Sequence, residues 1–247
     1  MLSSGQQRVD QRKADDLRVI RVKKSPQRDP SGSVLIEWGN THVLCSVNVE
    51  EKLPPWMQGE KSGWITAEYG MLPGCSDKRI HRDRIRSTGR THEIQRLIGR
   101  SIRACIDLDA LGPRTVQIDC DVIQADGGTR VASITGSYLA FRLALEKMKE
   151  KKIISRIPET TMVAAVSVGR INGEMLLDLN YVEDVKAELD ANIVMNSKSE
   201  FIEIQGTAEE GSFTRDEWNQ LLDVSTVGCK KIFEIQKAML LEWGLTP

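Results

Sequence analysis

Residues 124–130, with the sequence QADGGTR, place two glycines, a threonine and an arginine between an apolar-alternating run and an apolar run of helical spacing. Glycine allows a sharp turn that leaves backbone N–H groups accessible, and the start of the following helix adds unpaired N–H donors and the positive end of its dipole. Thr129 adds a hydroxyl, and Arg130 adds a planar cation that suits phosphate. From these residues alone, this anion loop (residues 124–130) is either a plain strand-to-helix turn or a binding site for an oxyanion.

A dense group of cations precedes a second helical run. Between residues 78 and 90 a single acid, Asp83, accompanies six basic side chains: Lys78, Arg79, Arg82, Arg84, Arg86 and Arg90. A loop of this charge suits a phosphate backbone, but it also suits a solvated loop or an ion-pair network between subunits. Arg90 differs from the others because it follows Gly89 and opens the helical run. It is therefore a second candidate ligand for an anion.

Acidic residues cluster in the stretch LDLNYVEDVKAELDAN, residues 177–192. Asp178 and Asp184 lie six residues apart, on either side of the expected end of an apolar strand. Such a pair can hold Mg²⁺ or donate a proton, whereas a solvated acidic loop is the alternative. Asp178 follows apolar residues, so it needs a charged or hydrogen-bonding partner if it is buried.

Together these groups suit transfer of a phosphoryl-type group on a polyanionic substrate, with phosphate itself as the nucleophile. The sequence contains no GxxxxGK[ST] loop, which argues against a small-molecule kinase. It also offers no Ser-His-Asp or Cys-His pairing, and its three histidines and five scattered cysteines lack the spacing of a zinc site.

The elements that must position these residues alternate between strand and helix. A hairpin is expected at residues 32–50 around Gly39-Asn40, followed by a strand at 63–72, a helix at 91–108, a strand at 115–123 and a helix at 131–150. A second hairpin turns at Asn172-Gly173, and NIVMN and FIEIQGT form a third. The last helix begins near Thr214, which has capping-box spacing to Glu217. This order predicts an α/β protein of two similar halves.

The bulk composition is that of an ordinary soluble protein. The chain has 247 residues, a net charge of −1, 40% hydrophobic residues and 28% charged residues, so any nucleic-acid surface must come from local clustering. No apolar run approaches the roughly 20 residues that span a bilayer, and residues 1–19 lack the apolar core of a secretory signal. Dispersed cysteines suggest reduced thiols, and we expect a cytoplasmic protein without membrane contact.

Long segments of the chain resemble the ribonuclease PH family. They include GSVLIEWGNTHVLCSVNVEE, GWITAEYGMLP, GRTHEIQRLIGRSIRACIDL, DCDVIQADGGTRVASITGSYLA, MVAAVSVGRINGEMLLDLNYVEDVKAELDANIVM and EIQGTAEEGSFT, and the resemblance runs from about residue 8 to 240. It implies an α/β (α+β) fold of two similar βαβ halves with a left-handed crossover and helices packed on mixed sheets. Residues 1–247 would form a single domain with halves at roughly 8–125 and 126–247.

The resemblance also implies an activity. Family members are phosphorolytic 3′→5′ exoribonucleases that trim the 3′ ends of tRNA precursors and other RNAs, with inorganic phosphate as co-substrate and nucleoside diphosphates as products. They form homohexameric rings built as trimers of dimers.

By motif, the resemblance assigns roles to eight residues of this chain. Phosphate binding falls to Arg90, Gly128, Thr129 and Arg130. Asp184 becomes the general acid or a Mg²⁺ ligand, with Asp178 supporting it or sharing the metal. Arg79 and Arg82 correspond to loop arginines that bind RNA.

The chain departs from the family pattern at four places. Gly74 stands where many members have arginine, the basic loop is about two residues short, Gln11 replaces a glycine, and Trp38 replaces a phenylalanine. The first two departures concern RNA-loop contacts, and none falls on a phosphate or acid position. The alternative function is a non-catalytic RNA-binding subunit of an exosome-like ring, although such subunits usually lose the acids or the anion-binding arginines.

Overall fold

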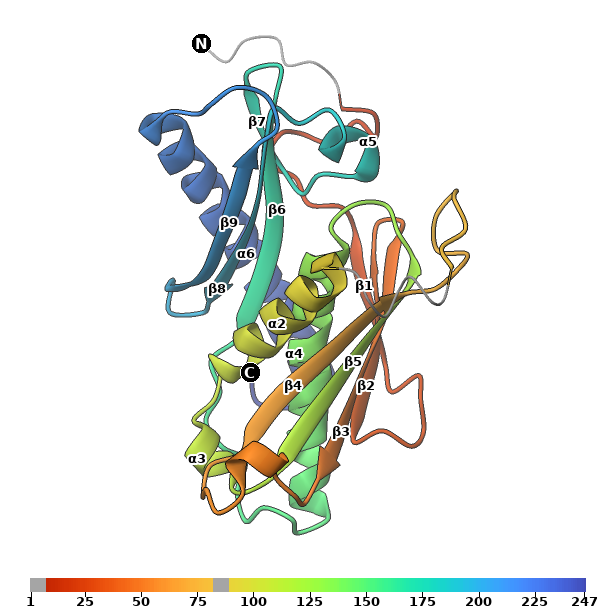
Figure 1. The fold of residues 1–247 in the computed structure, drawn as a ribbon, viewed down its shortest axis with the longest axis vertical. Coiled ribbons are helices and arrows are strands. Elements are labelled where there is room, and N and C mark those ends of the chain that lie inside the picture. The colour runs from red at the N-terminus through yellow and green to blue at the C-terminus, as the bar shows by residue number, and fades with distance from the viewer. Residues whose placement is uncertain (1–7, 82–88) are drawn as a thin grey trace.

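The structure, a computed structural model, describes residues 8–81 and 89–247 and contains two β-sheets in different parts of the chain (Figure 1). The first sheet has the strand order β1-β2-β3-β5-β4. Its strands are β1 (Ile20–Lys24), β2 (Gly32–Trp38), β3 (Thr41–Glu50), β4 (Trp64–Met71) and β5 (Thr115–Gln124). Only β4 and β5 are parallel, and the helices α2 (Gly89–Arg103) and α3 (Leu108–Leu111) lie in the crossover between them.

The second sheet has the order β7-β6-β8-β9 and is antiparallel throughout. Its strands are β6 (Val163–Ile171), β7 (Glu174–Leu177), β8 (Leu189–Asn196) and β9 (Phe201–Ala208). The helix α6 (Arg215–Glu242) packs against β6, and the four-residue helix α5 (Tyr181–Asp184) lies in the connection between β7 and β8. The expectation of mixed sheets therefore holds for the first sheet alone.

The helix α4 (Thr129–Glu150) joins the two sheets into one core. It packs against β2 and β3 on one side and against β6 on another, and most of its side chains are buried. On β2 and β3, the paired residues Val34 and Cys45 and the paired residues Ile36 and Val43 are fully buried. Because α4 begins at the anion loop, the core holds this loop at the junction of the two sheets.

Most predicted elements are present. The turns at Gly39-Asn40 and Asn172-Gly173 join β2 to β3 and β6 to β7, and Thr214 and Glu217 form the predicted capping box. The helix expected over 91–108 is wrong in its end, because α2 stops at Arg103 and the Asp107 side chain caps the separate helix α3. Neither β1 nor α5 was predicted. A domain division near residue 125 stays a prediction.

The described residues also include the short 3₁₀ helix η1 (Pro55–Met57). All five cysteines are free and buried. Within residues 8–81 and 89–247, no helix is both long enough and apolar enough to cross a membrane.

A close approach between β2 and α4 generates the first prediction. A Cβ added at Gly32 would lie 2.1 Å from the Ala140 carbonyl oxygen and 2.7 Å from the Ala144 amide nitrogen. Gly32→Ala should therefore force these elements apart and lower the free energy of unfolding by about 3 kcal/mol, as overpacking does. Urea denaturation measures this. Gly74→Ala is the control, because its added Cβ meets no described atom within 4 Å, and equal losses for both variants would contradict the packing argument.

Candidate active site

The anion loop turns through two glycines at the start of α4. Gly127 and Gly128 have φ angles of +72° and +66°, a region that disfavours residues with a Cβ. Gly128 is the N-cap of α4, and no side chain of the described residues caps that helix. The amides of its first turn are thus available to another acceptor, which is the arrangement that an anion site requires.

Thr129 places its hydroxyl at this helix terminus. Its Oγ1 lies 2.8 Å from the Tyr69 hydroxyl of β4, and both residues are buried. Burial raises the pKa of Tyr69, while the charges of Arg90 and Arg130 act in the opposite direction. The phenol is therefore a neutral hydrogen-bond partner, which orients the Thr129 hydroxyl beside two cations.

Arg130 connects α4 to α2 and β9. Its Nη1 donates to Gln205 Oε1 at 2.5 Å, and its Nη2 lies 3.7 Å from Glu93 Oε2. Gln205 Nε2 in turn donates to Glu93 Oε1 at 3.1 Å. Glu93 lies one turn after Arg90 on α2, so this chain of contacts brings the starts of the two helices together. Arg90 itself is exposed there.

Asp184, the last residue of α5, lies within the influence of these cations. Its carboxyl pKa is raised above the ordinary value because surrounding protein limits hydration of the charged form, although the residue is accessible at the surface. Arg90, Arg130 and Arg18 oppose this shift. The pKa of Asp190 on β8 is also raised, first by burial and then by the charge of Asp184. Asp184 thus combines access to solvent with a tendency to keep a proton, as a general acid must.

Asp178 has a different environment. It directly follows β7 rather than lying within it, has a φ of +57°, and is fully buried. Arg18 donates to both carboxylate oxygens, from Nη2 at 2.7 Å to Oδ1 and from its backbone amide at 2.7 Å to Oδ2. Trp38 Nε1 donates to Oδ2 at 2.9 Å, and Arg12 Nη1 does so at 3.3 Å. The buried carboxylate of Asp178 therefore has several hydrogen-bonding partners, two of them charged.

The N-terminal segment also holds the next acid. Arg8 and Glu183 form a buried ion pair at 2.6 Å, and Arg12 lies 3.4 Å from the same carboxylate oxygen. Arg8 further donates to the backbone carbonyls of Leu177 and Asp178. Sequence reasoning missed the roles of these arginines. The available signal was the departure at Gln11, since the motif RVDQR contains both Arg8 and Arg12.

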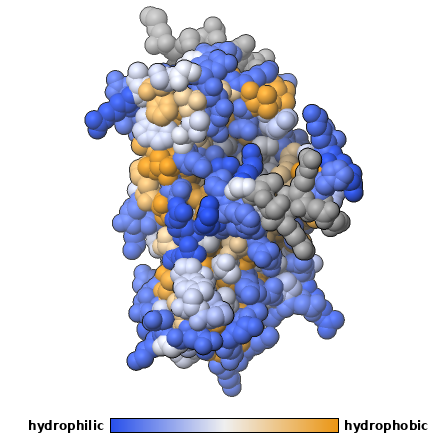
Figure 2. Space-filling model, in the orientation of Figure 1, coloured by the Kyte–Doolittle hydropathy of each residue, from blue (hydrophilic) through white to orange (hydrophobic). Residues whose placement is uncertain are grey.

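Of the two predicted RNA-binding arginines, only Arg79 belongs to the described residues, and it makes none of these contacts. Arg79 is exposed, with Nη1 3.4 Å from His81 Nδ1, and Arg82 lies outside the described residues. Hydrophilic side chains cover the middle of the face that Figure 2 presents, in the region where Figure 1 shows α2.

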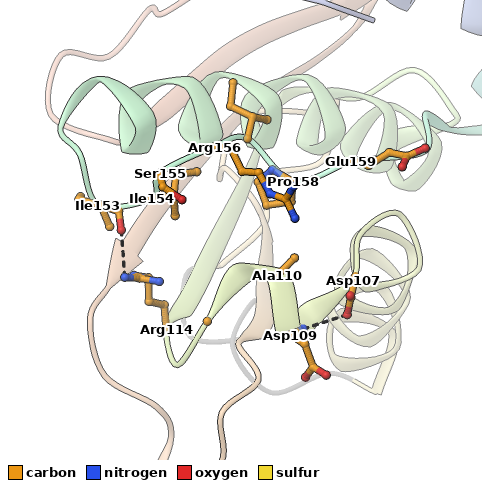
Figure 3. Close-up of a pocket in the computed structure, with 12 residues that line it drawn as sticks. Asp107, Asp109, Ala110, Arg114, Ile153, Ile154, Ser155, Arg156, Pro158 and Glu159 are labelled. Carbon is orange, nitrogen blue, oxygen red and sulfur yellow. Dashed lines mark hydrogen bonds between the residues drawn. The ribbon is translucent and has the colours of Figure 1, made fainter.

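A cavity of about 700 Å³ lies elsewhere, between α3 and residues 153–159 (Figure 3). It contains none of the predicted site residues. One of its two lining arginines, Arg114, donates to the carbonyls of Leu111 and Ile153 at 2.8 and 3.1 Å. Acidic side chains share the lining, so this cavity does not resemble the anion site.

Family models match both parts of the chain. Residues 16–145 match the 3′ exoribonuclease family, domain 1, and residues 161–237 match domain 2 of the same family. The chain therefore belongs to the 3′ exoribonuclease family. Relatives named ribonuclease PH, from Bacillus cereus (strain AH820) and Bacillus thuringiensis subsp. konkukian (strain 97-27), are each 51% identical over 236 residues. The alignments cover 94% of this chain and 96% of each relative, which confirms the predicted family.

Solved structures confirm the fold class. A crystal structure of rice (Oryza sativa) Rrp46 has a TM-score of 0.75 at 18% identity and covers 95% of this chain and 100% of its own. An Archaeoglobus fulgidus exosome with RNA bound to the active site has a TM-score of 0.77 at 19% identity and covers 92% of both chains.

The backbone at Gln11 generates a prediction for the N-terminal segment. Its φ is +63°, which costs a residue with a Cβ about 1–2 kcal/mol, and its amide closes a turn onto the Arg8 carbonyl at 2.9 Å. Gln11→Gly should relieve this strain and raise the melting temperature by a few degrees. Gln11→Ala, which keeps the Cβ, is the control. Calorimetry that gave the same melting temperature for both variants would contradict the strain.

Proposed function

We propose that the chain is a phosphate-dependent 3′→5′ exoribonuclease that uses Arg90, Gly128, Thr129 and Arg130 to bind inorganic phosphate and Asp184 to complete the reaction. The observation that carries the proposal is the uncapped start of α4, where Arg130 is linked through Gln205 and Glu93 to the start of α2. Arg90 and Arg130 also act on the carboxyl of Asp184, whose pKa is raised by burial. A bound anion and a proton donor are what phosphorolysis requires.

The reaction follows from these roles. A phosphate oxygen attacks the phosphorus of the terminal phosphodiester, and the bond from that phosphorus to the 3′-oxygen of the preceding nucleotide breaks. Asp184 gives its proton to this oxygen, and the departing product is a nucleoside diphosphate. Arg90 and Arg130 lower the energy of the attack by offsetting the repulsion between two anions. The reaction is reversible because a diester is exchanged for an anhydride of similar free energy.

Asp178 supports the site in this proposal. Both of its oxygens already accept hydrogen bonds from Arg12, Arg18 or Trp38, which favours the supporting role over a shared metal ligand. Across residues 8–81 and 89–247, no group of three or more His, Cys, Asp or Glu is arranged to hold a metal ion. The alternative role of Asp184 is that of a Mg²⁺ ligand in its deprotonated form, because Mg²⁺ commonly binds through one carboxylate plus substrate phosphates and waters. The ion would supply positive charge to the reacting phosphates.

We propose RNA with a 3′ extension, in particular tRNA precursors, as the substrate, bound by Arg79 and Arg82. The family assignment and the RNA named for the archaeal exosome support this choice. We also propose a cytoplasmic homohexamer built as a trimer of dimers.

The direct test of the activity is to incubate the protein with a tRNA bearing extra 3′ nucleotides, Mg²⁺ and phosphate. Absence of phosphate-dependent release of nucleoside diphosphates would overturn the function.

The alternative, a non-catalytic RNA-binding ring subunit, requires loss of the reacting groups. This chain keeps the cations and Asp184 together, so the structure favours catalysis. The same assay distinguishes the two, because a non-catalytic subunit would gain activity only after assembly with an active homologue.

Arg90→Ala should weaken phosphate use more than RNA use, because the charge of Arg90 acts on Tyr69 and Asp184 beside the proposed phosphate site. We expect the KM for phosphate to rise by roughly tenfold, the value of one charged hydrogen bond, with the KM for RNA little changed. Steady-state kinetics in both substrates measure this. Arg96→Ala, further along the same helix, is the matched control, and an equal rise in both KM values for Arg90→Ala would contradict phosphate binding.

Asp184→Ala should lower kcat by at least about 100-fold while RNA still binds, because a general acid contributes this much. In the wild type only the protonated carboxyl donates, so kcat should fall as pH rises through the raised pKa of Asp184. In Asp184→Asn this fall should be absent from the residual activity. Equal kcat for wild type and variants, or an unchanged pH profile, would overturn the assignment.

A further inference from the structure

The two reacting parts of the site come from different sheets. Thr129 and Arg130 begin α4, which follows β5 of the first sheet, whereas Asp184 ends α5, which connects β7 and β8 of the second sheet. In the proposed reaction the attacking phosphate and the proton donor act on opposite sides of one phosphorus. An error of about 1 Å in such an arrangement can cost about 100-fold in rate. The contacts between the anion loop and residues 178–184 therefore matter for turnover.

The backbones of these two segments touch. A Cβ added at Gly127 would lie 2.7 Å from the Asn180 carbonyl carbon, 2.7 Å from the Leu179 carbonyl oxygen and 2.8 Å from the Tyr181 amide nitrogen. The anion loop thus rests directly on the chain that leads from Asp178 into α5.

The Asp126 carboxylate adds hydrogen bonds to this backbone contact. Oδ1 accepts the Tyr181 backbone N–H at 3.2 Å, and Tyr181 is the first residue of α5. Oδ2 accepts Asn40 Nδ2 at 3.3 Å, from the turn between β2 and β3. The Asp126 carboxylate of the anion loop therefore accepts a hydrogen bond from the first amide of α5, the helix that carries Asp184.

The Asp126 backbone is held as well. Its carbonyl accepts Arg18 Nη1 at 2.5 Å, and the same guanidinium donates to the Asp178 carboxylate. Its amide donates to Thr41 Oγ1 at 2.9 Å, and that hydroxyl donates to the Gly127 carbonyl at 2.6 Å. The Asp126 backbone is thus held against the first sheet through Thr41 of β3, while the Asp126 side chain holds α5.

A carboxylate two residues before Gly128 in the sequence opposes the binding of phosphate, because like charges repel. We propose that Asp126 is a positioning residue that fixes the separation between the bound phosphate and the Asp184 carboxyl, at some expense in phosphate affinity. The proposal rests on the proposed function, and it assigns Asp126 no contact with substrate.

Three variants test it: Asp126→Ala, Asp126→Asn and Asp121→Ala. For Asp126→Ala we expect kcat to fall by about 10- to 100-fold, with the KM for phosphate unchanged or lower. Asp126→Asn keeps an oxygen that can accept the Tyr181 N–H, so its kcat should stay close to wild type. Asp121→Ala removes the same charge from exposed Asp121 on β5 without touching Tyr181, and should leave kcat unchanged.

Amide hydrogen exchange of residues 178–186 gives a readout that does not depend on activity. Asp126→Ala should speed exchange in this segment while α4 and α6 exchange as in the wild type. Wild-type kcat and unchanged exchange in Asp126→Ala would overturn the positioning role, as would a raised KM for phosphate with unchanged kcat. A wild-type protein without phosphate-dependent activity would overturn the proposed function instead, and the exchange comparison would still decide whether Asp126 holds α5.

Discussion

The rest of the site depends on how one buried charge is neutralised. Asp178 is fully buried, and its carboxylate accepts hydrogen bonds from Arg12, Arg18 and Trp38, which lie 140 residues or more away in the sequence. A buried charge left without its partners commonly costs about 3–5 kcal/mol. The N-terminal segment, the second hairpin and α5 therefore adopt this arrangement together. The interactions of the buried acid, Asp178, thus help to determine the position of the accessible acid, Asp184.

This arrangement divides the chemistry between two sheets. The cations stand at the starts of α2 and α4, which pack on the first sheet, whereas Asp184 belongs to a short helix attached to the second. A four-residue helix has little stability of its own. It is held by its capping box at Asn180 and Glu183 and by the Arg8 ion pair to Glu183. The raised pKa of Asp184 follows from this placement, because the protein that holds α5 also limits hydration of its last carboxyl.

Local signals explain what could be predicted from the sequence. The Asn172-Gly173 turn, the Thr214 capping box and the glycine turn into α4 each depend on residues within a few positions of one another, and all are present. The helix α5 was missed because four residues carry no periodicity. The partners of Asp178 were missed because hydrogen bonds across more than 100 residues leave no spacing to read. The need for a partner could still be predicted, since an acid after an apolar run is costly when buried.

Two departures from the family pattern meet at this same carboxylate, with opposite energetic signs. Gln11 adopts a positive φ in the turn between Arg8 and Arg12, where a glycine would be unstrained, so the segment that supplies both arginines carries a cost. Trp38 donates its indole N–H to Asp178 Oδ2 at 2.9 Å, whereas a phenylalanine has no donor to offer. The indole comes from a fully buried residue at the end of β2, so it holds the carboxylate without adding charge and without relying on the strained turn. In this chain the position of Asp178 is thus supported from the first sheet as well as from the N-terminal arginines.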